Sequence, residues 1–141
     1  MLPLVNYWSV LAAMLSSMVV GSVWYAPKVF GRRWMTLARI DPSHTGGAVR
    51  AISITVAVSF ITAWVLAGAV FVTWTSTGAP FFITALIVAV LLWAGFTAAR
   101  FITHDAFESR PATLTVLNIA HELVTVLVMA IIIGLWPPAG I

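Results

Sequence analysis

The sequence predicts an all-α polytopic membrane protein, a four-transmembrane-helix bundle with a short interfacial helix after helix one. Three observations predict it: 62% of the 141 residues are apolar, 8% are charged, and four long apolar runs are separated by short polar connections. Soluble proteins carry charge on about a quarter of their residues. We expect a single transmembrane domain over residues 1–141, because no polar stretch is long enough to fold separately.

The four runs are the predicted helices, and they cover residues 4–25, 51–72, 81–103 and 112–136. About 20 apolar residues are needed for a helix to cross a hydrocarbon core of about 30 Å. Backbone groups in lipid must be hydrogen-bonded internally, so such a run is helical or belongs to a closed barrel. Continuous apolarity without alternation excludes the barrel. The first run lacks a basic segment and a small-residue cleavage site, so we expect it to be retained.

The cations predict which side of the membrane each connection faces. Seven Lys and Arg against four Asp and Glu give a net charge of +3, and all seven cations lie in or beside the first and third connections. Short loops rich in Lys and Arg stay in the cytoplasm. We therefore expect a multi-pass protein of the inner cell membrane, with both termini and residues 73–80 on the non-cytoplasmic side. Membrane lipids are the expected partners, and nucleic acid is not.

The first connection carries the pattern of a short interfacial helix. From Lys28 to Arg39, cations alternate with apolar residues that recur at helical spacing, including Phe30 and Trp34. Such a helix lies in the cytoplasmic interface with its aromatic side chains in lipid and its arginines at anionic headgroups. A topology determinant that holds lipid nonspecifically and a specific lipid-binding element both fit this pattern.

The fourth predicted helix carries a polar stripe. Asn118, His121, Glu122 and Thr125 follow the spacing i, i+3, i+4 and i+7, which places them on one face. At 1.5 Å per residue, Glu122 lies about 15 Å from the inner helix end, close to the bilayer midplane. An ionisable residue at that depth is costly and is a functional hypothesis by default.

Two interpretations of this stripe remain open. In the first, it is a polar clamp that holds helices together, with hydroxyl groups of Ser16, Ser17, Ser59 and Thr62 at matching depth as hydrogen-bond partners. In the second, Glu122 exchanges a proton, His121 tunes or relays it, and a ligand binds beside them. The candidate site comprises Glu122 and His121 as acid-base groups and Asn118, Tyr25, Arg110 and Trp24 as ligand-binding groups.

Several chemistries are excluded or disfavoured by the residues present. There is no cysteine, which excludes disulfides, thiolate metal sites and a cysteine nucleophile. His121-Glu122 begins like the zinc-protease motif H-E-x-x-H but lacks its second histidine. No G-x-S-x-G elbow is present. His104, Asp105 and Glu108 could offer ligands to a metal, but such loop charges are more often solvated, so no metal and no cofactor is predicted.

The leading functional hypothesis is a small membrane protein that binds a small or lipophilic ligand, or handles protons, at the polar site on helix four. It would be transporter-like or sensor-like, and a homo-oligomer is expected because four helices enclose little volume. An alternative is a membrane-embedded enzyme that uses Glu122 and His121 as acid and base on a lipophilic substrate, with Asp105 or Glu108 assisting. A third hypothesis is a structural or partner-binding subunit.

Motifs near both ends of the chain resemble those of a known family. The pieces are Asn6-Tyr7-Trp8, the run from Gly21 to Pro27, Phe30-Gly31, Trp34, the run from Phe107 to Pro111, the run from Asn118 to His121, and Gly134-Leu135-Trp136. Together they resemble the bacterial membrane family catalogued as domain of unknown function seventeen-sixty-one. The resemblance implies a small four-helix membrane protein and implies no reaction.

Overall fold

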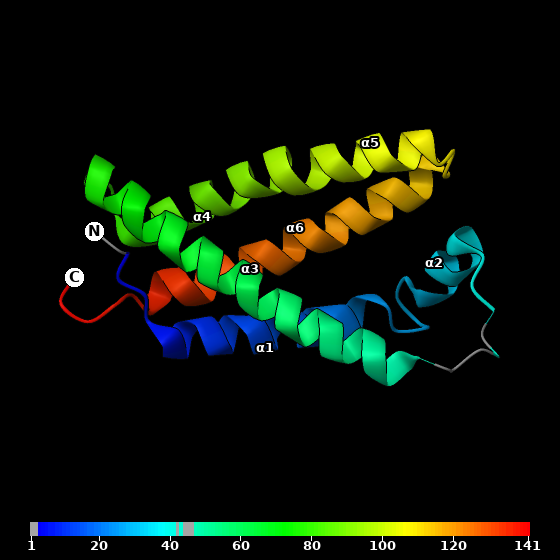
Figure 1. The fold of residues 1–141 in the computed structure, drawn as a ribbon, viewed down its shortest axis with the longest axis horizontal. Coiled ribbons are helices and arrows are strands. Elements are labelled where there is room, and N and C mark those ends of the chain that lie inside the picture. The colour runs from blue at the N-terminus through cyan, green and yellow to red at the C-terminus, as the bar shows by residue number, and fades with distance from the viewer. Residues whose placement is uncertain (1–2, 42, 44–46) are drawn as a thin grey trace.

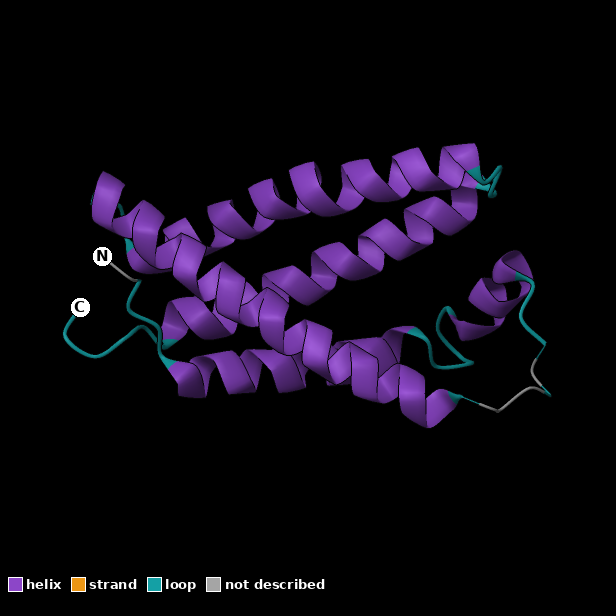
Figure 2. Cartoon of the chain, in the orientation of Figure 1, coloured by secondary structure: helices purple, strands orange, loops and turns teal. Residues whose placement is uncertain are grey.

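In the computed structural model, which describes residues 3–41, 43 and 47–141, the chain is a bundle of long helices without a strand in the described part (Figures 1 and 2). The helical segments are α1 (Tyr7–Trp24), α2 (Gly31–Ala38), α3 (Ala48–Thr77), α4 (Phe81–Leu92), the π-helix η1 (Trp93–Ala98), α5 (Ala99–Phe107) and α6 (Ala112–Leu135). The segments α4, η1 and α5 run on as one helix, Phe81–Phe107. The predicted all-α class is confirmed.

Four helices are long and apolar enough to cross a membrane, and their surface explains why they need one. They are α1, α3, the continuous helix Phe81–Phe107, and α6. At most 28% of the most apolar window of each is buried inside the bundle. Large apolar side chains such as Leu15, Val58 and Ile87 are therefore exposed. Soluble monomers rarely expose continuous apolar surface of this size, so the chain is a membrane protein.

Alanine residues lie at the helix contacts in the core of the bundle. α6 packs against α1 and α4, and α3 also packs against both of these helices. Ala13, Ala63, Ala85 and Ala130 are fully buried at these contacts. Small side chains let helix axes approach closely, which is how helices associate in lipid, where burial of apolar surface gives no driving force.

Both termini lie at one end of the bundle, and α2 lies at the other end, where the turn between α5 and α6 also lies (Figure 1). Asn6 joins the terminal segments. Its Oδ1 accepts hydrogen bonds from the amides of Trp8 and Ser9 and so caps α1, while its Nδ2 donates to the carbonyl oxygens of Trp136 and Pro137. The cap satisfies backbone donors that a helix start leaves free.

Helix boundaries differ from the apolar runs where hydroxyl groups support the backbone. α3 continues five residues past the predicted end, because the hydroxyls of Ser76 and Thr77 donate to carbonyl oxygens four residues earlier. It ends at Gly78, whose φ of 65° favours glycine. The predicted interfacial segment 28–39 contains α2, which ends at Arg39 in the left-handed conformation.

The π-helix η1 interrupts the third long helix. Its six residues, Trp93–Ala98, were predicted only as part of a regular helix. The indole Nε1 of Trp93 donates a 2.8 Å hydrogen bond to the carbonyl oxygen of Ile119 on α6. This bond joins the wider turn to α6 at the middle of the bundle. π-turns within α-helices are frequent at functional sites, which draws attention to the surroundings of η1.

Candidate functional site

A polar pocket opens between α6 and the end of the long helix that contains η1 and α5. Its volume is about 470 Å³. It is lined by Phe96, Thr97, Arg100, Phe101, His104, Asp105, Glu108, Arg110 and Asn118. The pocket combines aromatic walls with three cationic or imidazole groups, two carboxylates and one carboxamide, and it includes two predicted site residues, Asn118 and Arg110.

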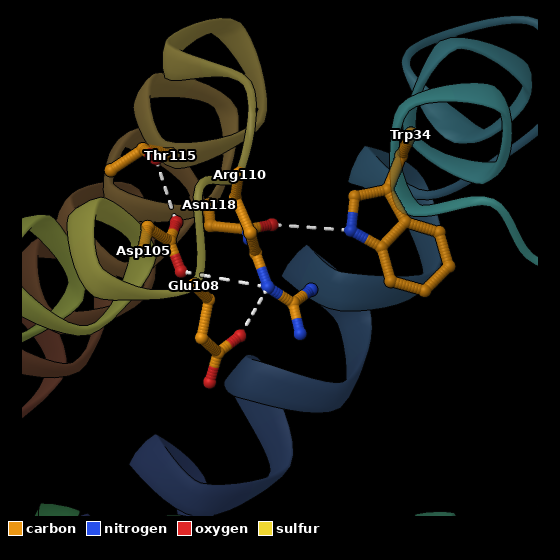
Figure 3. A network of polar contacts seen from close by, with 6 residues as sticks. All are labelled: Trp34, Asp105, Glu108, Arg110, Thr115 and Asn118. Carbon is orange, nitrogen blue, oxygen red and sulfur yellow. Dashed lines mark hydrogen bonds and ion pairs between the residues drawn. The ribbon is translucent and has the colours of Figure 1, made fainter.

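A charged network closes the pocket at the turn between α5 and α6 (Figure 3). The hydroxyl of Thr115 donates a 2.7 Å hydrogen bond to Oδ2 of the buried Asp105. The Nε of Arg110 donates to Oε2 of Glu108 at 2.6 Å and lies 4.0 Å from Oδ1 of Asp105. The hydrogen bond and the charge of Glu108 raise the pKa of Arg110, and Asp105 adds to this effect. Both carboxylates are thus already engaged within the protein.

The backbone of this turn is shaped for the network. Ser109 adopts a φ of 53°, and the amide of Arg110 donates to the carbonyl oxygen of Asp105 at 2.9 Å. The left-handed residue ends α5 and reverses the chain within a few residues. Thr115 therefore returns on α6 beside Asp105, although ten positions separate the two residues in the sequence.

Asn118 connects the pocket to α2. The indole Nε1 of Trp34 donates a 3.1 Å hydrogen bond to Oδ1 of Asn118 (Figure 3). The ring of Trp34 also meets the ring of Tyr25 edge-on, with centroids 5.0 Å apart. Trp34 was predicted to dip into lipid, and the structure adds that its indole is half-buried and bonded to α6.

His121 lies on the side of α6 that faces α1, inside an aromatic cluster. Its ring centroid is 4.9 Å from that of Tyr25 and 5.9 Å from that of Trp24. Gly21 of α1 lies beside it, where an added Cβ would come into ordinary contact with Nε2 of His121 at 3.7 Å. Both ring nitrogens are buried and have no hydrogen-bond partner in the described part of the chain. Nδ1 lies 3.3 Å from Oε1 of Glu122 without hydrogen-bond alignment.

Tyr25 stands at the end of α1, between His121 and Trp34. Burial, and secondarily the negative charge of Glu122, raise the pKa of Tyr25 to about 12. The phenol therefore stays neutral over the physiological range and can donate a proton in a hydrogen bond. Its ring completes a series of contacts that runs from the pocket through Asn118, Trp34 and Tyr25 to His121.

The structure divides the predicted site into two parts. Trp24, Tyr25, His121 and Glu122 gather between α1 and α6, whereas Asn118 and Arg110 line the polar pocket. Thr125 belongs to neither, because its hydroxyl donates to the carbonyl oxygen of His121 within α6.

Three of the four hydroxyl groups that the polar-clamp interpretation proposed as partners of Glu122 are bonded elsewhere. The hydroxyls of Ser16, Ser17 and Thr62 donate to carbonyl oxygens of their own helices and not to Glu122. Hydroxyls in apolar helices commonly bond back to the preceding turn, since no water is present to accept them. No group of three potential metal ligands is found among the residues that the structure describes.

Sequence reasoning missed Thr115 and the aromatic pair Phe96 and Phe101 as part of the site. A signal existed for Thr115, since a polar residue on the first turns of α6 faces the end of α5 across a short connection. Phe96 and Phe101 carry no such signal, because aromatic residues in a transmembrane run are usually in contact with lipid.

Comparison with known proteins places the chain in a family. No curated protein and no solved structure matches it significantly. A family model described as protein of unknown function (DUF1761) matches residues 8–134. That stretch contains all four long helices almost completely, α2, and both parts of the candidate site. The chain therefore belongs to the DUF1761 family of proteins of unknown function.

Proposed function

We propose that this chain is a membrane-integral binding protein that takes a small lipophilic or amphipathic molecule into the polar pocket. The observation that carries the proposal is the composition of the pocket, which joins aromatic walls to Arg100, Arg110 and Asn118. Its volume of about 470 Å³ lies within the range of about 300–1,000 Å³ that is usual for ligand sites. In this proposal the carboxamide of Asn118 orients the ligand, and Arg110 lies at the entrance of the pocket.

Binding in the pocket would be transmitted through Asn118. A ligand that takes a hydrogen bond from Asn118 changes how its Oδ1 receives the indole of Trp34, and Trp34 and Tyr25 are in ring contact. Tyr25 in turn packs on His121. A sensor-like or transporter-like role follows, in which ligand occupancy alters the position of α2 and the surroundings of His121.

The binding experiment uses three probes of equal chain length, dodecanoate, dodecanol and dodecyltrimethylammonium, titrated by calorimetry into the chain in phosphatidylcholine nanodiscs. Thr97→Phe places a ring in the pocket, and Thr103→Phe is the matched control on an exposed position of the same helix. We expect saturable binding of at least one probe that Thr97→Phe removes and Thr103→Phe retains. Absence of saturable binding by all three probes, or equal binding by both variants, would contradict the proposal.

A second candidate role, proton exchange, is favoured by the state of His121. Its two ring nitrogens are buried without hydrogen-bond partners, and the carboxylate of Glu122 is 3.3 Å from Nδ1. In this role Glu122 exchanges a proton and His121 tunes or relays it. Infrared difference spectra over a pH titration should contain a protonated carboxyl band that disappears in Glu122→Gln. A band of undiminished intensity in this variant would come entirely from the other carboxyl groups and would remove the role.

The proposal also includes the orientation of the protein in the membrane. We place the protein in the inner membrane of a bacterial cell with both termini outside, because the short connections carrying Lys and Arg are expected to stay in the cytoplasm. The chain has no cysteine, so a single cysteine introduced at Ser76 provides a unique label. It should react with an impermeant maleimide in intact cells. Reaction only after lysis would reverse the orientation. Assembly into a homo-oligomer is measured on the same purified sample by light scattering.

A further inference from the structure

An apolar groove adjoins the polar pocket. Its volume is about 390 Å³. It is lined by Ile61, Thr62, Val65, Leu66, Ala89, Leu92, Trp93, Phe96, Thr97 and Val126, which belong to α3, α4, η1 and α6. Phe96 and Thr97 of η1 line both the groove and the polar pocket. The two hollows are therefore neighbouring parts of one surface that changes from apolar to polar at the π-helix.

This change follows the axis of one helix and so has a measurable length. The groove covers Ala89 to Thr97, and the pocket continues from Phe96 to Glu108. At about 1.5 Å per residue, the apolar part extends about 12 Å. Half of a hydrocarbon core of about 30 Å is about 15 Å. The groove is therefore nearly as long as one leaflet is deep, and its polar end adjoins the pocket that contains Arg100.

The charged groups that remain free in the pocket favour a headgroup of negative charge. Asp105 and Glu108 are engaged by Thr115 and Arg110, as described above. The side chains of Arg100 and His104 have no hydrogen bond or ion pair within the part of the chain that the structure describes. Arg100 and His104 thus offer a guanidinium and an imidazole to a ligand, in addition to the carboxamide of Asn118. Guanidinium groups bind carboxylate and phosphate through paired hydrogen bonds.

We propose that the ligand is a single-chain amphiphile with an anionic headgroup, bound with its headgroup at Arg100 and its chain along Trp93. This inference rests on the proposed binding function and names the class of ligand. The groove is bounded by α3 on one side and by α4 and η1 on the other, and each wall offers side chains to one extended chain. Phe96, a residue that is 74% exposed, lies where the chain and the headgroup would meet.

The experiment uses Trp93 as the reporter, because bromine on an acyl chain quenches an indole that it touches. Brominated dodecanoate is added to the chain in phosphatidylcholine nanodiscs, and Trp93→Phe identifies the share of quenching that comes from the groove. We expect saturable quenching that Trp93→Phe removes. Arg100→Gln should weaken binding about fivefold, at the upper end for an exposed ion pair. Arg33→Gln removes the same charge from exposed α2 and should leave the affinity unchanged.

The remaining outcomes test the anionic headgroup and the binding function separately. Brominated dodecanol that binds as tightly as dodecanoate overturns the anionic headgroup and leaves the binding function standing. Absence of saturable binding by any dodecyl probe overturns both. Equal, unsaturable quenching by brominated phosphatidylcholine means that the groove holds ordinary lipid. If Arg100→Gln does not fold by circular dichroism, Thr62→Phe fills the groove from an exposed position and should abolish binding, with Thr55→Phe as its exposed control.

Discussion

Replacing Gly31 by alanine should detach α2 from the bundle. An added Cβ would collide with the carbonyl oxygen of Tyr25 and lie 2.9 Å from its carbonyl carbon, and backbone cannot move aside as a side chain can. Displacing α2 relieves the clash and breaks the 3.1 Å hydrogen bond from Trp34 to Asn118, worth about 1 kcal/mol. It also separates the Tyr25–Trp34 ring pair, worth about 0.5–1.5 kcal/mol.

The free energy of opening of α2 should therefore fall by about 1.5–2.5 kcal/mol. Hydrogen exchange with mass spectrometry measures it, as faster exchange of the α2 amides while those of α6 stay protected. Gly95→Ala is the control, because a Cβ there meets nothing within 4 Å. Trp34→Phe, which keeps a ring and loses the donor, should account for about 1 kcal/mol of the effect. Unchanged exchange in α2 after Gly31→Ala, or loss of protection throughout the bundle, would refute the reasoning.

Two further predictions concern titration and buried charge. In Tyr7→Phe, Tyr25 is the remaining tyrosine, and its phenolate absorbance should appear with a midpoint near pH 12, because burial favours the neutral phenol. Since the folded pKa exceeds the unfolded value of 10.0, this contribution to stability is complete below pH 10 and is lost as the pH rises through 12; a midpoint near 10 would contradict the burial. Thr115→Val removes the hydrogen bond that Asp105 accepts from Thr115 and should lower the free energy of unfolding by about 1–3 kcal/mol. Thr113→Val, at an exposed position of the same helix, should change it little.

The four long helices were predictable because hydrophobicity alone encodes them. A run of about 20 apolar residues has no other stable state in lipid than a helix, so their existence and order do not depend on neighbours. Their ends depend on more local chemistry. The hydroxyls after Val72 extend α3 by bonding to its own carbonyl oxygens, and hydropathy assigns such residues to the loop.

The candidate site was predictable only in part, because spacing gives the face of a helix and not what faces it. Asn118 and His121 share a stripe on α6, yet they meet different neighbours, the indole of Trp34 in one case and the rings of Trp24 and Tyr25 in the other. Which aromatic residue bonds to α6 and which contacts lipid depends on the packing of α2. The amino-acid type alone does not distinguish these two environments, because tryptophan and tyrosine are suited to both.

The π-helix has a consequence for how this family can vary in length. A turn closed by bonds to the fifth residue contains one residue more than a regular turn, and each residue of an α-helix accounts for about 100° of rotation. Deleting one residue within Trp93–Ala98 would convert η1 to α-helix and leave everything after it in nearly the same orientation, because the wider turn already contains the extra residue. The same deletion within α4 would rotate everything after it by about that angle, and would turn Asp105 away from Thr115. A one-residue gap at η1 in a relative would thus be compatible with the same set of charged side chains, whereas a gap in α4 would not.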